Sequence, residues 1–113
     1  MDCIFCKIAN KEVDTELVYE NDHLVIFKDM SPQAPVHLLA IPRDHIESAN
    51  EINPDNAHLI GEIYQAIGEL AKKEGFAEDG YRIVNNCGED GGQTVGHLHF
   101  HILAGRNLQW PPG

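Results

Sequence analysis

The stretch His97-Leu98-His99-Phe100-His101-Ile102-Leu103 decides most of what this sequence predicts. Histidine alternates with an apolar residue, a pattern typical of a half-buried β-strand. On a strand the three histidines would share one face, about 6.6 Å apart in steps of two, and the apolar residues would face the core. Packing alone explains such a face poorly, because imidazoles are costly to bury without partners. We therefore expect this strand, from about residue 95 to 103, to carry chemistry.

Two kinds of chemistry could use three aligned imidazoles. One is metal ligation, as in a metal-dependent hydrolase. The other is nucleophilic catalysis, in which one imidazole attacks while its neighbours move protons or bind an anion. The preceding segment, Gly91-Gly92-Gln93-Thr94-Val95, favours nucleophilic catalysis, because exposed backbone N–H groups and a hydroxyl can hold a phosphate. Both interpretations stay open on these residues alone.

The rest of the chain predicts a single α+β domain over residues 1–113. Strands are expected at 16–20, 24–28, 36–41 and 81–86, and a short helical turn within 3–11. A long helix is expected to begin at Asn53-Pro54-Asp55, to carry an apolar stripe from Ile60 to Ala71, and to end at Gly75. Because short links join most of the strands, we expect a five-stranded antiparallel sheet with helices on one face.

Size and charge exclude several classes of protein. A chain of 113 residues with 42% hydrophobic residues supports one core and no second domain. Its 8 Lys+Arg against 18 Asp+Glu give a net charge of −10, which repels nucleic-acid backbones and anionic lipid. No apolar run approaches the roughly 20 residues that span a bilayer, and no signal-type segment opens the chain. We expect a cytoplasmic protein that binds neither nucleic acid nor membrane.

Cys3-Ile4-Phe5-Cys6 forms a C-x-x-C pair with several interpretations: a zinc site, thioredoxin-like redox chemistry, or two chance thiols. The redox interpretation needs a strand before the motif, and no strand precedes residue 3. A zinc site needs two further ligands, which histidines can supply. The third cysteine, Cys87, is expected to be a spare thiol.

Together these motifs resemble the histidine triad (HIT) family, whose signature is three histidines separated by single apolar residues and followed by two more. Residues 97–103 match that signature at every position. Residues 31–37, 90–95 and 110–113 resemble the nucleotide-binding, purine nucleoside phosphoramidase branch of the family. The resemblance covers nearly the whole chain and implies the five-stranded fold with one long helix and a short N-terminal helix.

The resemblance implies hydrolysis or transfer at the α-phosphate of a purine nucleotide, with a nucleoside 5′-phosphoramidate as substrate. His99 would attack phosphorus and form a covalent nucleotidyl-histidine. His101 and His37 would stabilise the phosphoryl oxygens and assist proton transfer, and Thr94, where the branch commonly has serine, would reach the leaving group. The alternatives are a dinucleoside polyphosphate hydrolase and a nucleotide-binding interaction module. The terminal Trp-Pro-Pro-Gly tilts against the first and the intact triad against the second.

The resemblance also implies which residues bind the purine mononucleotide. Asp29 would accept hydrogen bonds from the ribose hydroxyls, as a carboxylate can, and Asn86 would hold the phosphate or the leaving group. The family is homodimeric, so Trp110 in the tail would pack near the partner's site. The base would lie among Ile4, Phe5, Ile8 and Met30, and the phosphate among Gly92, Gln93, Thr94, Val95, His99 and His101.

A subset of the family carries the same C-x-x-C pair and binds structural zinc. The ligands implied here are Cys3, Cys6, His45 and His97. Two thiolates and two imidazoles make a closed tetrahedral set, which suits a structural ion rather than a catalytic one. This assignment would give His97 a role different from that of His99.

Overall fold

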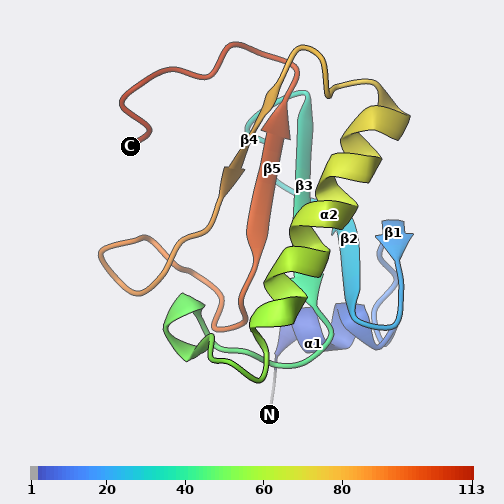
Figure 1. Cartoon of the computed structure of the whole chain (residues 1–113), viewed down its shortest axis with the longest axis vertical. Coiled ribbons are helices and arrows are strands. Elements are labelled where there is room, and N and C mark those ends of the chain that lie inside the picture. The colour runs from blue at the N-terminus through green and yellow to red at the C-terminus, as the bar shows by residue number, and fades with distance from the viewer. Residues whose placement is uncertain (1–2) are drawn as a thin grey trace.

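The computed structural model describes residues 3–113, in which five antiparallel strands form one sheet and a long helix lies across one face (Figure 1). The elements in chain order are α1 (Ile4–Ala9), β1 (Leu17–Glu20), β2 (Leu24–Lys28), β3 (Val36–Pro42), a 3₁₀ turn η1 (Ala49–Glu51), α2 (Ala57–Glu74), β4 (Tyr81–Val84) and β5 (Phe100–Ala104). The strand order is β1-β2-β3-β5-β4, so the last strand inserts between β3 and β4. The predicted α+β fold, with its long helix and short N-terminal helix, is confirmed.

An apolar layer lies on each face of the sheet. Leu98, Phe100 and Ile102 belong to the layer beneath α2, as their alternation with histidine predicted. On the opposite face, α1 buries Phe5 and Ile8 against β2 and β3. The expectation that the helices lie on one face was therefore wrong, because α1 and α2 cover opposite faces of the sheet. The histidines therefore lie on the α1 side. No helix within residues 3–113 is long and apolar enough to cross a lipid bilayer.

The long helix starts later than predicted, at Ala57. Asn53 still acts at this end, because its Oδ1 accepts the backbone N–H groups of Asp55 at 2.8 Å and Asn56 at 3.2 Å. These bonds form a turn before the first helical residue. The helix ends at Gly75, whose φ of 86° is the left-handed conformation that glycine adopts without steric cost. Tyr64, within the predicted stripe, is 49% exposed and lies at the edge of the buried face.

Several strand boundaries differ from the prediction, and β3 and β5 each end one residue later, at Pro42 and Ala104. β1 begins at Leu17, β4 ends at Val84, and β5 begins at Phe100 rather than near residue 95. His97 and His99 consequently lie in the approach to β5 and not within a strand. The ladder between β3 and β5 stops at the pair Ala40–Phe100. Beyond that pair the approach bonds to the loop after β3 instead, since the Leu98 N–H donates to the Ile46 carbonyl at 2.6 Å.

Candidate functional site

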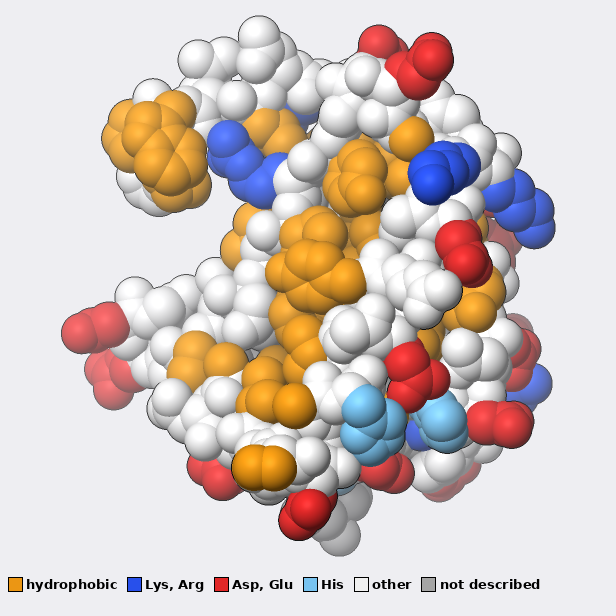
Figure 2. All heavy atoms as spheres, viewed as in Figure 1, with side chains coloured by type: hydrophobic (Ala, Val, Ile, Leu, Met, Phe, Trp, Pro, Cys, Tyr) orange, Lys and Arg blue, Asp and Glu red, His pale blue; other side chains and the backbone are white. Residues whose placement is uncertain are grey.

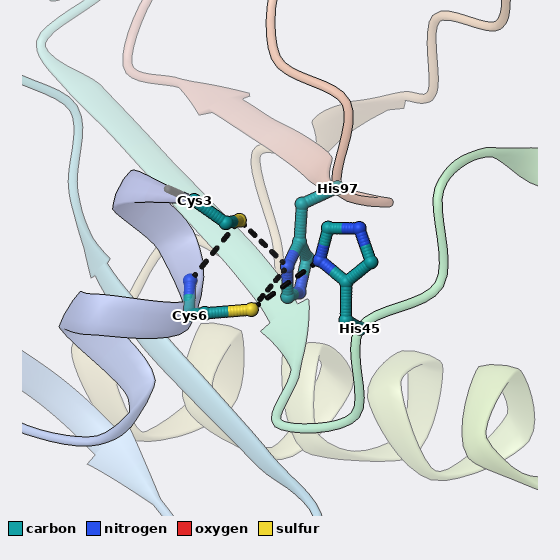
Figure 3. A group of neighbouring side chains, drawn as sticks. All are labelled: Cys3, Cys6, His45 and His97. Atoms are coloured by element: carbon teal, nitrogen blue, oxygen red, sulfur yellow. Dashed lines mark hydrogen bonds between the residues drawn. The ribbon is translucent and has the colours of Figure 1, made fainter. Parts of the chain in front are cut away.

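Four side chains converge where α1 meets the approach to β5 (Figure 3). Cys3 and Cys6 come from the start of α1, His45 from the loop after β3, and His97 from the approach itself. The Cys3 Sγ lies 3.3 Å from the His97 Nδ1. The Cys6 Sγ lies 3.3 Å from the His45 Nδ1 and 3.5 Å from the His97 Nδ1. All four ligand atoms lie within 4.8 Å of one another.

The spacing and hydrogen bonding of this cluster fit a tetrahedral metal ion. Metal–sulfur bonds of about 2.3 Å and metal–nitrogen bonds of about 2.0 Å would place S and N ligands about 3.5 Å apart. The His97 Nε2 donates to the Pro42 carbonyl at 2.9 Å, which leaves the lone pair on Nδ1, the atom that faces both sulfurs. Metal-binding histidines commonly make such an outer hydrogen bond. Burial lowers the pKa of His97 and so favours its neutral, ligating form. These four residues can hold a metal ion.

In its neutral form, the His99 ring has one nucleophilic nitrogen, which its hydrogen bonding selects. Its Nδ1 lies 2.7 Å from the backbone carbonyl oxygen of His97. Because a carbonyl can only accept, Nδ1 carries the proton and Nε2 keeps its lone pair. Phe5 packs edge-on against the ring with centroids 5.1 Å apart, and the side chain is buried. The arrangement orients a single nitrogen for attack.

A chain of hydrogen bonds sets the tautomers of His37 and His101. The Gln33 backbone N–H donates to the His37 Nδ1 at 3.0 Å, so the proton of the neutral His37 ring lies on Nε2. That Nε2 lies 2.9 Å from the His101 Nδ1 and donates to it. His101 then carries its own proton on Nε2. Burial is the main cause that lowers the pKa of His101, and repulsion from His99 and His37 lowers this pKa further. Both effects favour the neutral ring.

Asp29 lies beside His37 and His101. The contacts of these three residues test the interpretation of the site as that of a metal-dependent hydrolase. Its Oδ1 accepts the Ser31 N–H at 2.8 Å, and its Oδ2 lies 3.4 Å from the His37 Nε2 and 4.0 Å from the His101 Nδ1. Asp29, His37 and His101 could be taken for a second set of metal ligands. However, the His37 Nδ1 lone pair is used by the Gln33 amide and Nε2 carries the proton. Neither nitrogen of His37 is free to ligate an ion, so the hydrogen bonding argues against a metal centre here.

The glycine-rich loop is organised by the side chain of Gln93. Its Oε1 accepts the Gly88 N–H at 3.0 Å. Its Nε2 donates to the carbonyls of Glu47 at 2.8 Å and Val95 at 2.9 Å. The side-chain amide of Gln93 therefore holds the conformation of the loop through these hydrogen bonds.

Glycine is required twice within this loop. A side chain at Gly91 would strike the backbone oxygen of Cys87, and Gly92 has a φ of 80°. The N–H groups of Gly92 and Gln93 donate to carbonyls inside the turn, each at 3.0 Å. Among the described residues, the amides of Gly91, Thr94 and Val95 have no protein acceptor. The expected set of phosphate-binding amides is thus narrower than the whole segment.

The remaining predicted nucleotide-binding residues differ in exposure. Phe5 and Ile8 are buried in the α1 layer, where Phe5 contacts His99. Ile4 is 48% and Met30 96% exposed. Asn86 is half-buried just after β4, and Trp110 is 80% exposed in the tail. Within the chain described, Trp110 has no aromatic partner.

Two residues that organise the site were not predicted. Gln33 sets the tautomer of His37 through its backbone N–H. Asn85 donates its Nδ2 to the backbone carbonyl of His99 at 2.9 Å. Both act on or through backbone atoms, which a residue pattern does not display. The only available signal was position, since Asn85 is the next-to-last residue of the predicted fourth strand.

Comparison with known proteins agrees with this geometry. The family pattern described as "Scavenger mRNA decapping enzyme C-term binding" matches residues 2–109. An uncharacterized HIT-like protein of Synechococcus elongatus is 46% identical over 112 residues, covering 99% of this chain and 97% of that protein. The chain belongs to the HIT family.

Other relatives of this HIT protein include hydrolases. The purine nucleoside phosphoramidase of Escherichia coli is 41% identical over 105 residues, 93% of this chain and 88% of that protein. The crystal structure of a HIT family hydrolase from Legionella pneumophila superposes with a TM-score of 0.96 at 46% identity, covering 99% of this chain and 100% of the other. A histidine triad protein from Clostridium difficile superposes with a TM-score of 0.94 at 48% identity, covering 96% and 95%.

Proposed function

We propose that this HIT protein hydrolyses purine nucleoside 5′-phosphoramidates at the α-phosphate, through a covalent nucleotidyl intermediate on His99. The observation that carries the proposal is the 2.7 Å hydrogen bond from the His99 Nδ1 to the His97 carbonyl. It leaves a nucleophilic Nε2 on a buried histidine that lies beside His101, with ring centroids 5.3 Å apart. The similarity to the phosphoramidase of Escherichia coli supports the class of substrate.

In the first step, the His99 Nε2 attacks phosphorus and the bond from phosphorus to the amine nitrogen breaks. The electron pair of that bond stays on the amine, which takes up a proton from solvent near the Thr94 hydroxyl, and the second step returns one proton to solvent. The His99 ring becomes positively charged once Nε2 is bonded to phosphorus. Its Nδ1–H then donates a charge-assisted hydrogen bond to the His97 carbonyl, which stabilises this state.

In the second step, water attacks the phosphorus of the nucleotidyl-histidine and releases the nucleoside monophosphate. The electron pair of the phosphorus–nitrogen bond returns to the His99 Nε2, and the proton lost by the water goes to solvent. His101 donates from Nε2 to a phosphoryl oxygen in both steps, since its Nδ1 is occupied by His37. A donor that is already oriented costs no reorganisation when charge develops on that oxygen.

In this proposal, the nucleotide binds to groups that surround the triad. Asp29 accepts from the ribose hydroxyls with the lone pairs that the Ser31 amide leaves unused. The phosphate lies against the amides of Thr94 and Val95, with Asn86 beside it. The base packs on apolar side chains contributed by Ile4, Phe5, Ile8 and Met30, of which Met30 is the most exposed.

The proposal is tested by intact mass after rapid quench with adenosine 5′-phosphoramidate. A nucleotidyl adduct is expected on the parent protein, mapped to His99, and none on His99→Ala. His58→Ala is the matched control, because His58 is an exposed histidine on α2. If His99→Ala kept turnover near the parent rate, the proposed mechanism would be wrong.

The metal of the cysteine–histidine cluster is proposed to be structural Zn²⁺. Cys3, Cys6, His45 and His97 fill all four tetrahedral positions, so no position remains for substrate or water. Thiols stay available to an ion in a reducing cytoplasm, which is the compartment that this proposal assumes. The ion would join α1 to the approach to β5, and so to the backbone that carries His99.

The protein is further proposed to act as a homodimer. β4 is an edge strand of the sheet, and an unpaired edge favours pairing with another chain. Figure 2 shows a band of apolar side chains beside α2, next to a hollow beneath the C-terminal tail. Three aromatic side chains are exposed, namely Tyr64 (49%), Tyr81 (36%) and Trp110 (80%). A partner subunit would cover them, with the tail of each subunit near the other's site.

A further inference from the structure

One side-chain hydrogen bond ties the end of β4 to the histidine that precedes β5. The Asn85 Nδ2 donates to the backbone carbonyl of His99 at 2.9 Å, in a part-buried position. Asn85 directly follows Val84, the last residue of β4. The bond therefore joins two segments that have both just left the sheet.

The main-chain ladders stop short of His99 on both sides. β4 pairs with β5 as far as Val84 opposite His101, and β3 pairs with β5 as far as Ala40 opposite Phe100. Backbone groups beyond the end of a ladder need other partners. Among the described residues, the Asn85 side chain is the partner of the His99 carbonyl, where the next bond of a longer ladder would have been.

The β3 side holds the two preceding residues instead. The Leu98 N–H donates to the Ile46 carbonyl at 2.6 Å, and the His97 Nε2 donates to the Pro42 carbonyl at 2.9 Å. These bonds anchor residues 97 and 98, and the ladder pair Ala40–Phe100 holds Phe100, but none of them reaches the carbonyl oxygen of His99. Asn85 supplies the anchor from the β4 side.

We infer that Asn85 is a positioning residue for His99, setting the orientation of its peptide group and thereby the direction of its Nε2. The kinetic consequence rests on the proposed function. The His99 ring donates to the His97 carbonyl, so the tautomer of the ring and the direction of its Nε2 both depend on the conformation of residues 97–99. Rotation of the His99 peptide group would weaken that bond and misalign the attack on phosphorus. Reaction rates are sensitive to such misplacement of a reacting atom.

The test compares two alanine substitutions that each remove a side-chain amide bonded to a backbone carbonyl. Asn85→Ala removes the bond to His99, and Asn56→Ala removes a 3.1 Å bond to the Glu51 carbonyl at the start of α2. For Asn85→Ala we expect kcat to fall about tenfold, with KM and the Kd for a nucleoside monophosphate within about twofold of the parent. For Asn56→Ala we expect both kinetic constants to stay at the parent values, with a similar change in Tm.

A kcat within about twofold of the parent, in an Asn85→Ala protein that is folded, overturns the inference. Asn85→Val, which favours extended backbone and also lacks the donor, replaces Asn85→Ala if that variant does not fold. Imidazole ¹⁵N spectra give a readout that is independent of activity. We expect His99 to carry its proton on Nδ1 in the parent and to show mixed tautomers in the variant. If the parent hydrolyses no phosphoramidate, the proposed function fails, and an unchanged single tautomer in the variant then overturns the role of Asn85.

Discussion

At the scale of single residues, His97, His99 and His101 differ in which ring nitrogen is available for chemistry. In each of them, the hydrogen bond made by the other ring nitrogen determines this difference. His97 donates from Nε2 to the Pro42 carbonyl and presents Nδ1 to the two cysteines. His99 donates from Nδ1 to the His97 carbonyl and presents Nε2. His101 accepts at Nδ1 from His37 and presents an Nε2–H. The same side chain can thus serve as a metal ligand, a nucleophile or a donor, depending on which nitrogen is occupied.

His101 makes a prediction about stability and pH. Burial holds the pKa of its folded form below the ordinary value of 6.5, while the unfolded chain titrates near that value. As pH falls below 6.5, the unfolded state gains a proton that the folded state does not, so the free energy of unfolding decreases. We expect this loss to be smaller in His101→Phe, measured by urea unfolding at pH 7 and at pH 5.5. Equal pH dependence in parent and variant would contradict the prediction.

At the scale of elements, patterns within one segment predicted well, and boundaries set by neighbouring segments did not. The alternation of Leu98, Phe100 and Ile102 placed them correctly beneath α2. Gly75 correctly ended the helix. The start of β5 was wrong because its ladder with β3 ends at the pair Ala40–Phe100, two residues before β3 itself ends. The loop after β3, which bonds to the approach instead, lies far from His97 in sequence. Asn85 was missed for the same reason, since its partner is a backbone carbonyl 14 residues away.

The glycine-rich loop gives a prediction at this scale. Gln93→Ala removes three hydrogen bonds that hold the loop to Gly88, Glu47 and Val95. A loop that must be ordered when nucleotide binds loses affinity, because ordering costs conformational entropy. We expect the Kd for a nucleoside monophosphate to rise about tenfold, measured by calorimetry. Glu89→Ala at the exposed tip of the loop is the control and should leave the Kd unchanged; equal affinities for Gln93→Ala and parent would count against this role of Gln93.

At the scale of the whole molecule, the net charge is −10, and the proposed phosphate site contains no lysine or arginine. The two facts are compatible because the proposed site does not depend on cationic side chains. In the proposed function the donors are backbone amides and imidazoles, which would bind one phosphate group through oriented dipoles. The acidic surface still disfavours polyanions, whose binding needs clustered basic residues. The net charge therefore disfavours nucleic acids as ligands and is compatible with the small nucleotide of the proposed function.

The cysteine–histidine cluster predicts that metal contributes to the stability of the whole chain. Its four residues join the N-terminal helix to the loop after β3 and to the approach to β5 (Figure 3). Binding that requires the folded arrangement stabilises it. We expect slow chelation with 1,10-phenanthroline to lower the Tm of the parent and of Cys87→Ser, but not that of Cys3→Ser, which should already be lower. Freshly purified, unchelated protein with no bound metal would remove the proposal.

The proposed homodimer predicts that two inactive variants restore activity to each other. If Trp110 of each subunit completes the site of its partner, a dimer of His99→Ala with Trp110→Ala contains one intact site. That site takes His99 from one chain and Trp110 from the other. Random exchange in an equal mixture would make half of the dimers mixed and about a quarter of all sites intact. We expect the kcat/KM of the mixture to rise after exchange at low denaturant, while the mass in solution stays twice the 12.6 kDa of one chain. If Trp110 served its own subunit instead, every mixed dimer would still lack an intact site, and exchange would add no activity.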